Sequence, residues 1–202
     1  MKAYKFLKDD LRSGSGDEPP WSIGKKRTIK GKLALCQRGY HSSPSFYDAL
    51  GYAAGNVACI VEITEPTERQ NDKYVSHSCT IVSAVSAEKI LRTWGCDCAE
   101  RALKQAKITN EQSWNAIKIA RLYNEGKATK EELSAAGSAA ESAAWSAARS
   151  AAGSAEWSAA GSAAESAAWS AAESVARSAE TEWQKLHLEE LINAELKREE
   201  TK

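Results

Sequence analysis

The chain has 202 residues, in which 27 lysines and arginines balance 27 aspartates and glutamates. This length suits one or two domains, and the zero net charge excludes an overall field that would attract nucleic acid or a membrane surface. Five cysteines cannot form a complete disulfide set, no apolar run approaches the roughly 20 residues of a membrane span, and the start lacks the apolar core of a signal peptide. We therefore expect a cytoplasmic protein with reduced thiols.

Residues 1–94 carry strand patterns and all four prolines of the chain. Alternation and β-branched runs predict strands over "KAYKFL" (2–7), "KGKLALC" (30–36), "NVACIVEIT" (56–64) and "SCTIVSAV" (78–85). Between them, Ser43 before Pro44 predicts the start of a helix, in which Phe46, Leu50 and Ala53 share one face. The pattern predicts an α+β domain with a small mixed or antiparallel sheet and one helix.

Residues 95–202 contain no proline and predict helices, so we place the domain boundary near Gly95. A short helix is expected over 96–106, and a second over 110–126 with Asn110 as its N-cap and Gly126 as its C-cap. Thr129 and Glu132 have the spacing of a capping box and predict the start of a third helix.

A tetrapeptide repeat, Ser-Ala-Ala-x with variations, occupies residues 134–181, and its twelve serines run from Ser134 to Ser178. Alanine strongly favours helix, and the β-branched residues that a β-solenoid needs are missing, so helix is the expected state. Four residues turn a helix by about 400°, so each tetrad advances about 40° around the axis. Trp145, Trp157 and Trp169, 12 residues apart, therefore point in directions about 120° apart.

Because these indole side chains point in different directions, they can be buried only by neighbours on more than one side of the helix. Either the repeat folds back on itself, with a break at Gly153 or Gly161, or a partner winds around it with right-handed sense. We favour the fold-back, giving a helical hairpin or bundle, and the remaining alternative is a solvated alanine-rich helix that acts as a spacer. The chain then ends in a conventional apolar stripe made of Trp183, Leu186, Leu188, Leu191, Ile192 and Leu196.

Two segments resemble known families. Residues 2–92, with "KAYKFL", "LCQRGYHSSPSFYDALGYA" and "DKYVSHSCTIVSAV", resemble a family of uncharacterised phage and prophage proteins, which carries a Gly-aromatic-His turn, a short helix and then a lysine-containing strand. Residues 96–145, with "CDCAERAL" and "SWNAIKIARLYNEGKATKEEL", resemble helical immunity proteins of bacterial toxin systems. Both resemblances imply a protein of mobile elements that resides in a bacterial host cell.

The segment "GYHSSPSFYDALGYA" is also similar to the turn and helix beside the nicotinamide pocket of ADP-ribosyltransferases. On that interpretation, His41 would anchor a ribose, Tyr47 or Tyr52 would stack on nicotinamide, and Glu62 or Glu88 would stabilise the oxocarbenium-like transition state.

The sequence departs from that pattern in two ways. No glutamate stands in a recognisable catalytic motif, and Lys5 occupies the place of the usual arginine or histidine of the first strand. The alternative is a capped helix packed on a sheet, with His41 hydrogen-bonded in the turn. We assign no catalytic residue on the sequence alone.

Metal and nucleic-acid sites are not expected. The pairs Cys96/Cys98, His77/Cys79 and Cys36/His41 lack the repeated C-x2-C spacing of zinc sites. The basic run "GKKRTIKGK" (24–32) has no interleaved aromatic residues, so we interpret it as a solvated face. No cofactor is predicted.

Tryptophan is the strongest hot-spot residue at protein interfaces, and the chain has seven. We therefore predict a non-catalytic, phage- or prophage-associated module that binds protein through Trp145, Trp157, Trp169 and Trp183. Its partner would be a protein of the host or of a competing element, such as a defence factor or toxin that it neutralises, or a second copy of the chain. The alternative function is an ADP-ribosyltransferase-like enzyme that uses a nucleotide cofactor at residues 40–47.

Overall fold

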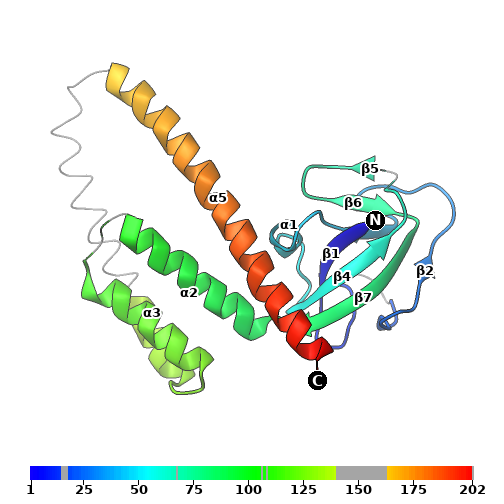
Figure 1. Cartoon of the computed structure of the whole chain (residues 1–202), viewed down its shortest axis with the longest axis horizontal. Coiled ribbons are helices and arrows are strands. Elements are labelled where there is room, and N and C mark those ends of the chain that lie inside the picture. Colours follow the sequence, from blue (N-terminus) through cyan, green and yellow to red (C-terminus); the bar gives the residue numbers. More distant parts are fainter. Residues whose placement is uncertain (15–17, 67, 106, 108, 140–162, 202) are drawn as a thin grey trace. The chain divides into compact units, whose positions relative to one another are not determined.

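A computed structural model describes residues 1–14, 18–66, 68–105, 107, 109–139 and 163–201, with side chains left undescribed over 163–178. The chain forms two units (Figure 1): an α+β unit, Met1–Ile90 with Trp183–Lys202, and a helical unit, Leu91–Glu182. The sequence placed the boundary near Gly95 and assigned residues 183–202 to the helical half. The structure groups this last segment with the α+β unit instead.

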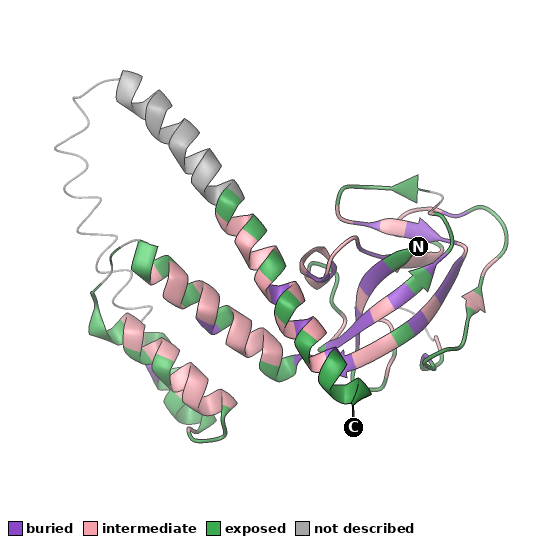
Figure 2. Cartoon of the chain, viewed as in Figure 1, coloured by how far each residue is buried: buried purple, intermediate pink, exposed green. Residues whose placement is uncertain are grey.

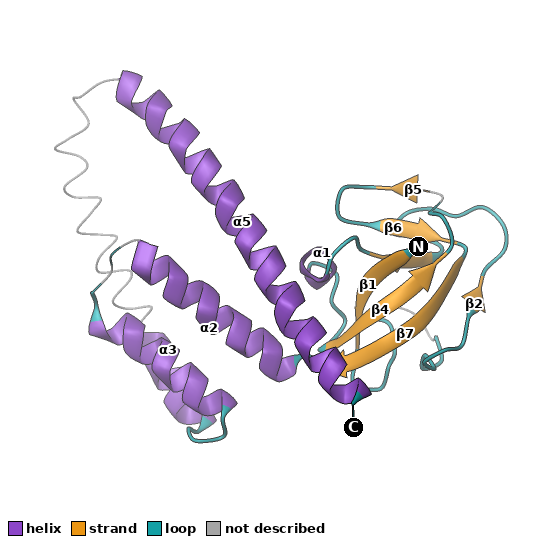
Figure 3. Ribbon diagram, in the orientation of Figure 1, coloured by secondary structure: helices purple, strands orange, loops and turns teal. Residues whose placement is uncertain are grey.

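Two antiparallel sheets form the α+β unit (Figure 3), where the strand patterns predicted one small mixed or antiparallel sheet. The four-stranded sheet has the order β1 (Lys2–Leu7), β4 (Val57–Ile63), β7 (Ser78–Ser86) and β2 (Arg27–Thr28). The three-stranded sheet has the order β3 (Tyr40–Ser42), β6 (Tyr74–Ser76) and β5 (Glu68–Arg69). The fold class is therefore α+β, and the strands expected at 2–7, 56–64 and 78–85 are confirmed.

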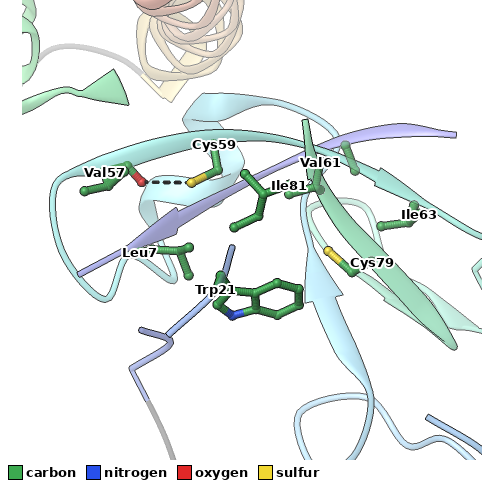
Figure 4. Close-up of a cluster of buried hydrophobic side chains, with 9 residues drawn as sticks. Leu7, Trp21, Val57, Cys59, Val61, Ile63, Cys79 and Ile81 are labelled. Carbon is green, nitrogen blue, oxygen red and sulfur yellow. Dashed lines mark hydrogen bonds between the residues drawn. The ribbon is translucent and has the colours of Figure 1, made fainter. Parts of the chain in front are cut away.

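The side chains of β1 alternate between two apolar environments. Tyr4 and Phe6 pack against Phe46, with ring centroids 4.5 and 6.2 Å apart. On the other side, Ala3 and Leu7 are fully buried in the main core of the sheet. Side chains from β1, β4 and β7 gather there around the ring of Trp21, which is 2% exposed (Figure 4). The alternation places Lys5 on this second side, between Ala3 and Leu7.

The strand predicted over residues 30–36 is wrong, because this segment turns back on itself. A single bridge pairs Ala34 with Arg38, and the Arg38 N–H donates to the Ala34 carbonyl over 2.8 Å. Gly31, Cys36 and Gly39 adopt positive φ angles of 89°, 64° and 132°, which a strand cannot accommodate. The apolar pattern that suggested a strand reflects one buried anchor, Leu33.

The helix after Pro44 is short and begins two residues later than expected. Helix α1 spans Phe46–Leu50, and its N-cap is Ser45, whose hydroxyl accepts from the Asp48 N–H over 3.1 Å. Ser43, the predicted start, instead exchanges two backbone hydrogen bonds with Tyr4 of β1, of 2.9 and 2.8 Å. The chain between β3 and α1 is therefore fixed to the first strand.

The helical unit contains most of α2 (Glu88–Gln105) and all of α3 (Glu111–Asn124). Gly95 lies inside α2 rather than between units. Asn110 caps α3 as predicted, accepting from the Ser113 N–H over 3.0 Å, but the C-cap is Glu125, and Gly126 follows it with a φ of 74°.

Helical structure also accounts for the described parts of the repeat. The capping box of Thr129 and Glu132 is present, with bonds of 2.7 and 3.1 Å, and residues 130–139 are helical. Helix α5 spans Ala163–Glu200, which confirms helix over the tetrads from 163 onward. Trp145, Trp157 and the expected break at Gly153 or Gly161 lie outside the described residues, as does the side chain of Trp169. None of the described helices is long and apolar enough to cross a bilayer.

The last turns of α5 belong to the α+β unit because three apolar residues of one face are buried there. Leu188 and Ile192 are fully buried and Leu196 is 5% exposed, at a spacing of four residues (Figure 2). The Tyr4 hydroxyl donates to Glu189 over 3.0 Å, and Lys185 pairs with Asp48 of α1 at 3.5 Å. The predicted stripe is confirmed at these three residues, whereas Leu186 is 59% exposed.

Candidate functional site

A cleft of about 790 Å³ opens within the α+β unit, a volume in the range of small-molecule sites. Residues of β1, β3, the turn 36–39 and the chain after α1 line it, together with Lys73 ahead of β6 and with Ser13, Gly14 and Glu18. The charged residues among the described lining are Lys5, Arg38, Lys73 and Glu18, so cations outnumber anions. An anionic ligand is therefore favoured in this cleft.

Lys73 is a buried ammonium whose neighbours lie within contact distance. It is 8% exposed, and its Nζ lies 3.1 Å from the Cys36 Sγ and 3.7 Å from the centroid of the Tyr52 ring. The Tyr52 hydroxyl donates in turn to Asp72 over 2.6 Å. Burial opposes the charge of Lys73, but the contacts with Cys36 and Tyr52 outweigh it and raise the pKa of Lys73. Lys73 is therefore a fixed positive charge in the cleft.

Lys5 has a different environment. Its Nζ lies 5.0 Å from the centroid of the Trp21 ring, and Cys59 of β4 pairs with it in register. No salt bridge links Lys5 to a carboxylate among the residues that the structure describes. Burial lowers the pKa of Lys5, because an apolar environment disfavours the ammonium form.

His41 joins the turn 36–39 to β3. Its Nε2 accepts a hydrogen bond from the Cys36 N–H over 2.8 Å. This agrees with the alternative interpretation of the sequence, in which His41 is hydrogen-bonded in the turn. Burial, and then the charges of Lys5 and Lys73, lower the pKa of His41. A neutral imidazole with an accepting Nε2 carries its proton on Nδ1. His41 thus holds the turn in place as a neutral group.

Ser42 presents an unsatisfied hydroxyl at the wall of the cleft. It is 5% exposed, and its Oγ has no hydrogen-bond partner among the described residues. A buried hydroxyl without a partner is costly in free energy, and a turn of the Ser42 side chain toward the cleft would let a ligand there remove that cost. Ser42 is therefore a lining residue whose hydroxyl is left without a partner.

The remaining charged lining residues serve the protein itself. The Arg38 guanidinium donates to the carbonyls of Lys30 and Lys32, each over 2.7 Å. Glu18 lies 3.7 Å from Arg27 and accepts from the Ser13 hydroxyl over 3.2 Å. These contacts fix the walls of the cleft and leave the amines of Lys5 and Lys73 as the groups available to a ligand.

The structure brings together only some of the residues proposed for an ADP-ribosyltransferase-like site. His41 and Tyr52 line the cleft, but Tyr47, Glu62 and Glu88 do not. The Tyr47 ring lies 5.6 Å from the Lys185 Nζ, and Glu62 is an exposed residue of β4 in register with Lys2. Trp183 stacks on His187 at 4.9 Å, at the start of the segment 183–202.

Sequence reasoning missed Ser42 and Lys73 as site residues. A signal existed for Lys73, since the resemblance to phage proteins includes a lysine in a strand of this region. Ser42 gave no signal, because its lack of a partner depends on the packing around it.

Comparison with known proteins finds a family model that is similar to the part of the chain that forms the cleft. Residues 1–93 match the family model of a domain of unknown function, DUF7666. Every lining residue of the cleft, from Tyr4 to Lys73, falls within the DUF7666 match, whereas the segment 183–202 lies beyond it. No curated protein and no solved structure matches the chain.

Proposed function

We propose that the α+β unit binds a small anionic ligand with a planar ring, of the nucleotide class, in this cleft. The observation that carries the proposal is the presence of two lysines, Lys5 and Lys73, in one cavity whose lining also includes Ser42, a residue with an unpartnered hydroxyl. Phosphate oxygens accept hydrogen bonds from lysine amines and from hydroxyls, so a phosphate-bearing ligand matches the chemistry of this lining.

The aromatic part of the ligand has a surface at the edge of the cleft. Tyr52 is 48% exposed although its ring lies over a charged lysine and its hydroxyl is bonded to Asp72. Both contacts fix the ring, and a fixed, exposed ring is suited to stacking on a base or a nicotinamide. The sequence predicted this role for Tyr47 or Tyr52, and of the two only Tyr52 lines the cleft.

Binding is better supported than group transfer. An ADP-ribosyl transfer needs a carboxylate close to the reacting sugar, and neither Glu62 nor Glu88 lines the cleft. Glu18, the carboxylate that does line it, already contacts Arg27 and Ser13.

Protein binding through the tryptophans stays a prediction. Trp145 and Trp157 lie outside the described residues, and Trp169 contributes only its backbone. The associated roles, in a phage or prophage and against a defence factor or toxin, likewise stay predictions from the resemblances.

Calorimetric titration of the full chain with ADP and with NAD tests the ligand proposal. We expect saturable binding of at least one of them, weakened about 10- to 100-fold by Lys73→Met, because a charged hydrogen bond contributes about 1.5–3 kcal/mol. Lys26→Met is the matched control, since it makes the same change at an exposed residue outside the cleft.

Ser42→Ala provides a second variant that keeps every charge. It removes one neutral hydrogen bond and should weaken binding about threefold to tenfold. The proposal is wrong if neither ADP nor NAD gives saturable heat, or if folded Lys73→Met protein binds them as tightly as Lys26→Met protein does.

A further inference from the structure

The position of Lys5 is the most unusual feature of the cleft. Its neighbours on the same side of β1, Ala3 and Leu7, are both fully buried in the apolar core. Lysine is rarely found between two buried apolar residues on one side of a strand, because its charged ammonium group loses its hydration there. Unlike Ala3 and Leu7, Lys5 lines the cleft and is only half-buried, so a ligand in the cleft can reach it.

The groups that face Lys5 do not compensate its charge. They are Cys59 of β4, Cys79 of β7, His41 of β3, Arg27 of β2 and Glu18. Burial raises the pKa of the Cys59 thiol to about 12 and that of the Cys79 thiol to about 11, so both are neutral at physiological pH. Glu18 is shared with Arg27, whose guanidinium stacks 4.1 Å from the centroid of the Trp21 ring.

The two lysines of the cleft are therefore suited to different tasks. Lys73 keeps its proton through contacts with Cys36 and Tyr52, and so attracts an anion. Burial favours the neutral amine of Lys5, and a neutral amine is a nucleophile. Pairs of titratable groups whose environments shift their pKa values apart are characteristic of sites that do chemistry.

We infer that Lys5 is a reactive lysine that forms a Schiff base with an anionic aldehyde or ketone held in the cleft. The nitrogen lone pair attacks the carbonyl carbon, and a proton passes from nitrogen to the carbonyl oxygen to give a carbinolamine. Loss of that oxygen as water leaves the C=N bond, so amine and carbonyl give imine and water without an oxidant or reductant. This inference deepens the proposed function and rests on the same cleft.

Reductive labelling of the full chain tests the inference. The protein is incubated with pyridoxal 5′-phosphate, the imine is reduced with sodium borohydride, and peptide mass spectrometry locates the adduct. We expect Lys5 to be labelled about tenfold or more faster than the exposed Lys26 at neutral pH, since each unit of lower pKa gives about ten times more neutral amine. Lys5→Arg should abolish this labelling, and Lys26→Arg should leave it unchanged.

The pH profile adds a readout that a merely structural lysine would not change. Labelling of Lys5 should become half-maximal at a lower pH than labelling of Lys26. Equal rates at Lys5 and Lys26, or coincident pH profiles, would overturn the inference.

A second probe separates the two proposals. Pyridoxal, which lacks the phosphate, should label Lys5 more slowly, and ADP should protect Lys5 from both probes. If ADP binds but Lys5 is not labelled, the reactive lysine is wrong and the binding cleft stands. If Lys5 is labelled equally by both probes and ADP neither binds nor protects, the anion site is wrong and the reactive lysine stands.

Discussion

Lys5 and Lys73 share one cleft, but their pKa values move in opposite directions because their contacts differ. Lys73 has a thiol at 3.1 Å and a tyrosine ring at 3.7 Å, whose interactions with the charge exceed the cost of burial. Around Lys5 the thiols are neutral and Glu18 is shared with Arg27, so burial dominates. The buried Lys5 therefore lowers the stability of the folded protein, and a residue with a purely structural role would not require this loss.

Replacing Lys5 should make the protein more stable at neutral pH. Since its pKa is lower in the folded than in the unfolded protein, the unfolded state binds more protons, and folding is penalised wherever Lys5 is charged when unfolded. Lys5→Met removes this penalty, which is about 1.4 kcal/mol for each unit of pKa difference. Urea unfolding near pH 7 should show a higher free energy of unfolding for Lys5→Met than for the unmodified protein.

The stability difference between Lys5→Met and the unmodified protein should depend on pH. The gain in the free energy of unfolding is complete below the folded pKa of Lys5 and shrinks as the pH rises toward the unfolded pKa of about 10.4. Above that pH, only differences in packing between methionine and lysine contribute. Lys26→Met, at an exposed site, should show no such trend. A gain of constant size from pH 6 to pH 10 would show that the lysine charge is not its cause.

Secondary structure was predictable where the pattern reflects the local chain. The alternation of residues 2–7 and the apolar run of 56–64 correspond to β1 and β4, and the caps at Asn110 and Thr129 form as expected. The segment 30–36 was not predictable in this way, because its positive φ angle at Cys36 and the bridge of Ala34 to Arg38 depend on the hydrogen bonds that Arg38 makes. This turn forms one wall of the cleft.

Helix α5 shows how a stripe at the end of an element can stabilise a distant part of the chain. Leu188 is fully buried in the α+β unit, whereas Leu186, two residues earlier, is 59% exposed. Leu188→Ala should lower the free energy of unfolding by about 2–5 kcal/mol, the usual cost of a cavity at a buried leucine. Leu186→Ala is the matched control and should change it by about 0.5 kcal/mol or less.

Chemical denaturation of the full chain measures both variants. The tyrosine hydrogen bond from Tyr4 to Glu189 gives an independent check, since Glu189→Gln retains a partner and should cost far less than Leu188→Ala. Equal destabilisation by Leu188→Ala and Leu186→Ala would contradict the packing of this segment.

At the scale of the molecule, the sequence predicted the class of fold but not the division into units. Residues 183–202 have the amphipathic pattern of any surface helix, and the pattern does not say which unit buries its apolar face. The candidate site was partly predictable for a similar reason: His41 and Tyr52 lie in a continuous motif, whereas Ser42 and Lys73 acquire their roles from contacts across β3 and β6. Local pattern therefore identified the region of the site, and tertiary contacts select its residues.

The division into units predicts that the α+β unit survives without the residues between its two segments. In the test variant, a Gly/Ser linker of about 20 residues, with a typical span of about 25 Å, replaces residues 91–182 and joins 1–90 to 183–202. We expect a single cooperative urea transition, because the sheets, α1 and the buried face of α5 are all retained.

A variant that ends after the same linker, without residues 183–202, isolates the contribution of the last helical turns. It loses Leu188, Ile192 and Leu196 from the apolar core, so its urea midpoint should fall well below that of the joined variant. Equal midpoints would show that the last turns of α5 add nothing to the α+β unit. A joined variant that fails to fold would show that the unit needs the helical residues 91–182, and that the two units are not independent in stability.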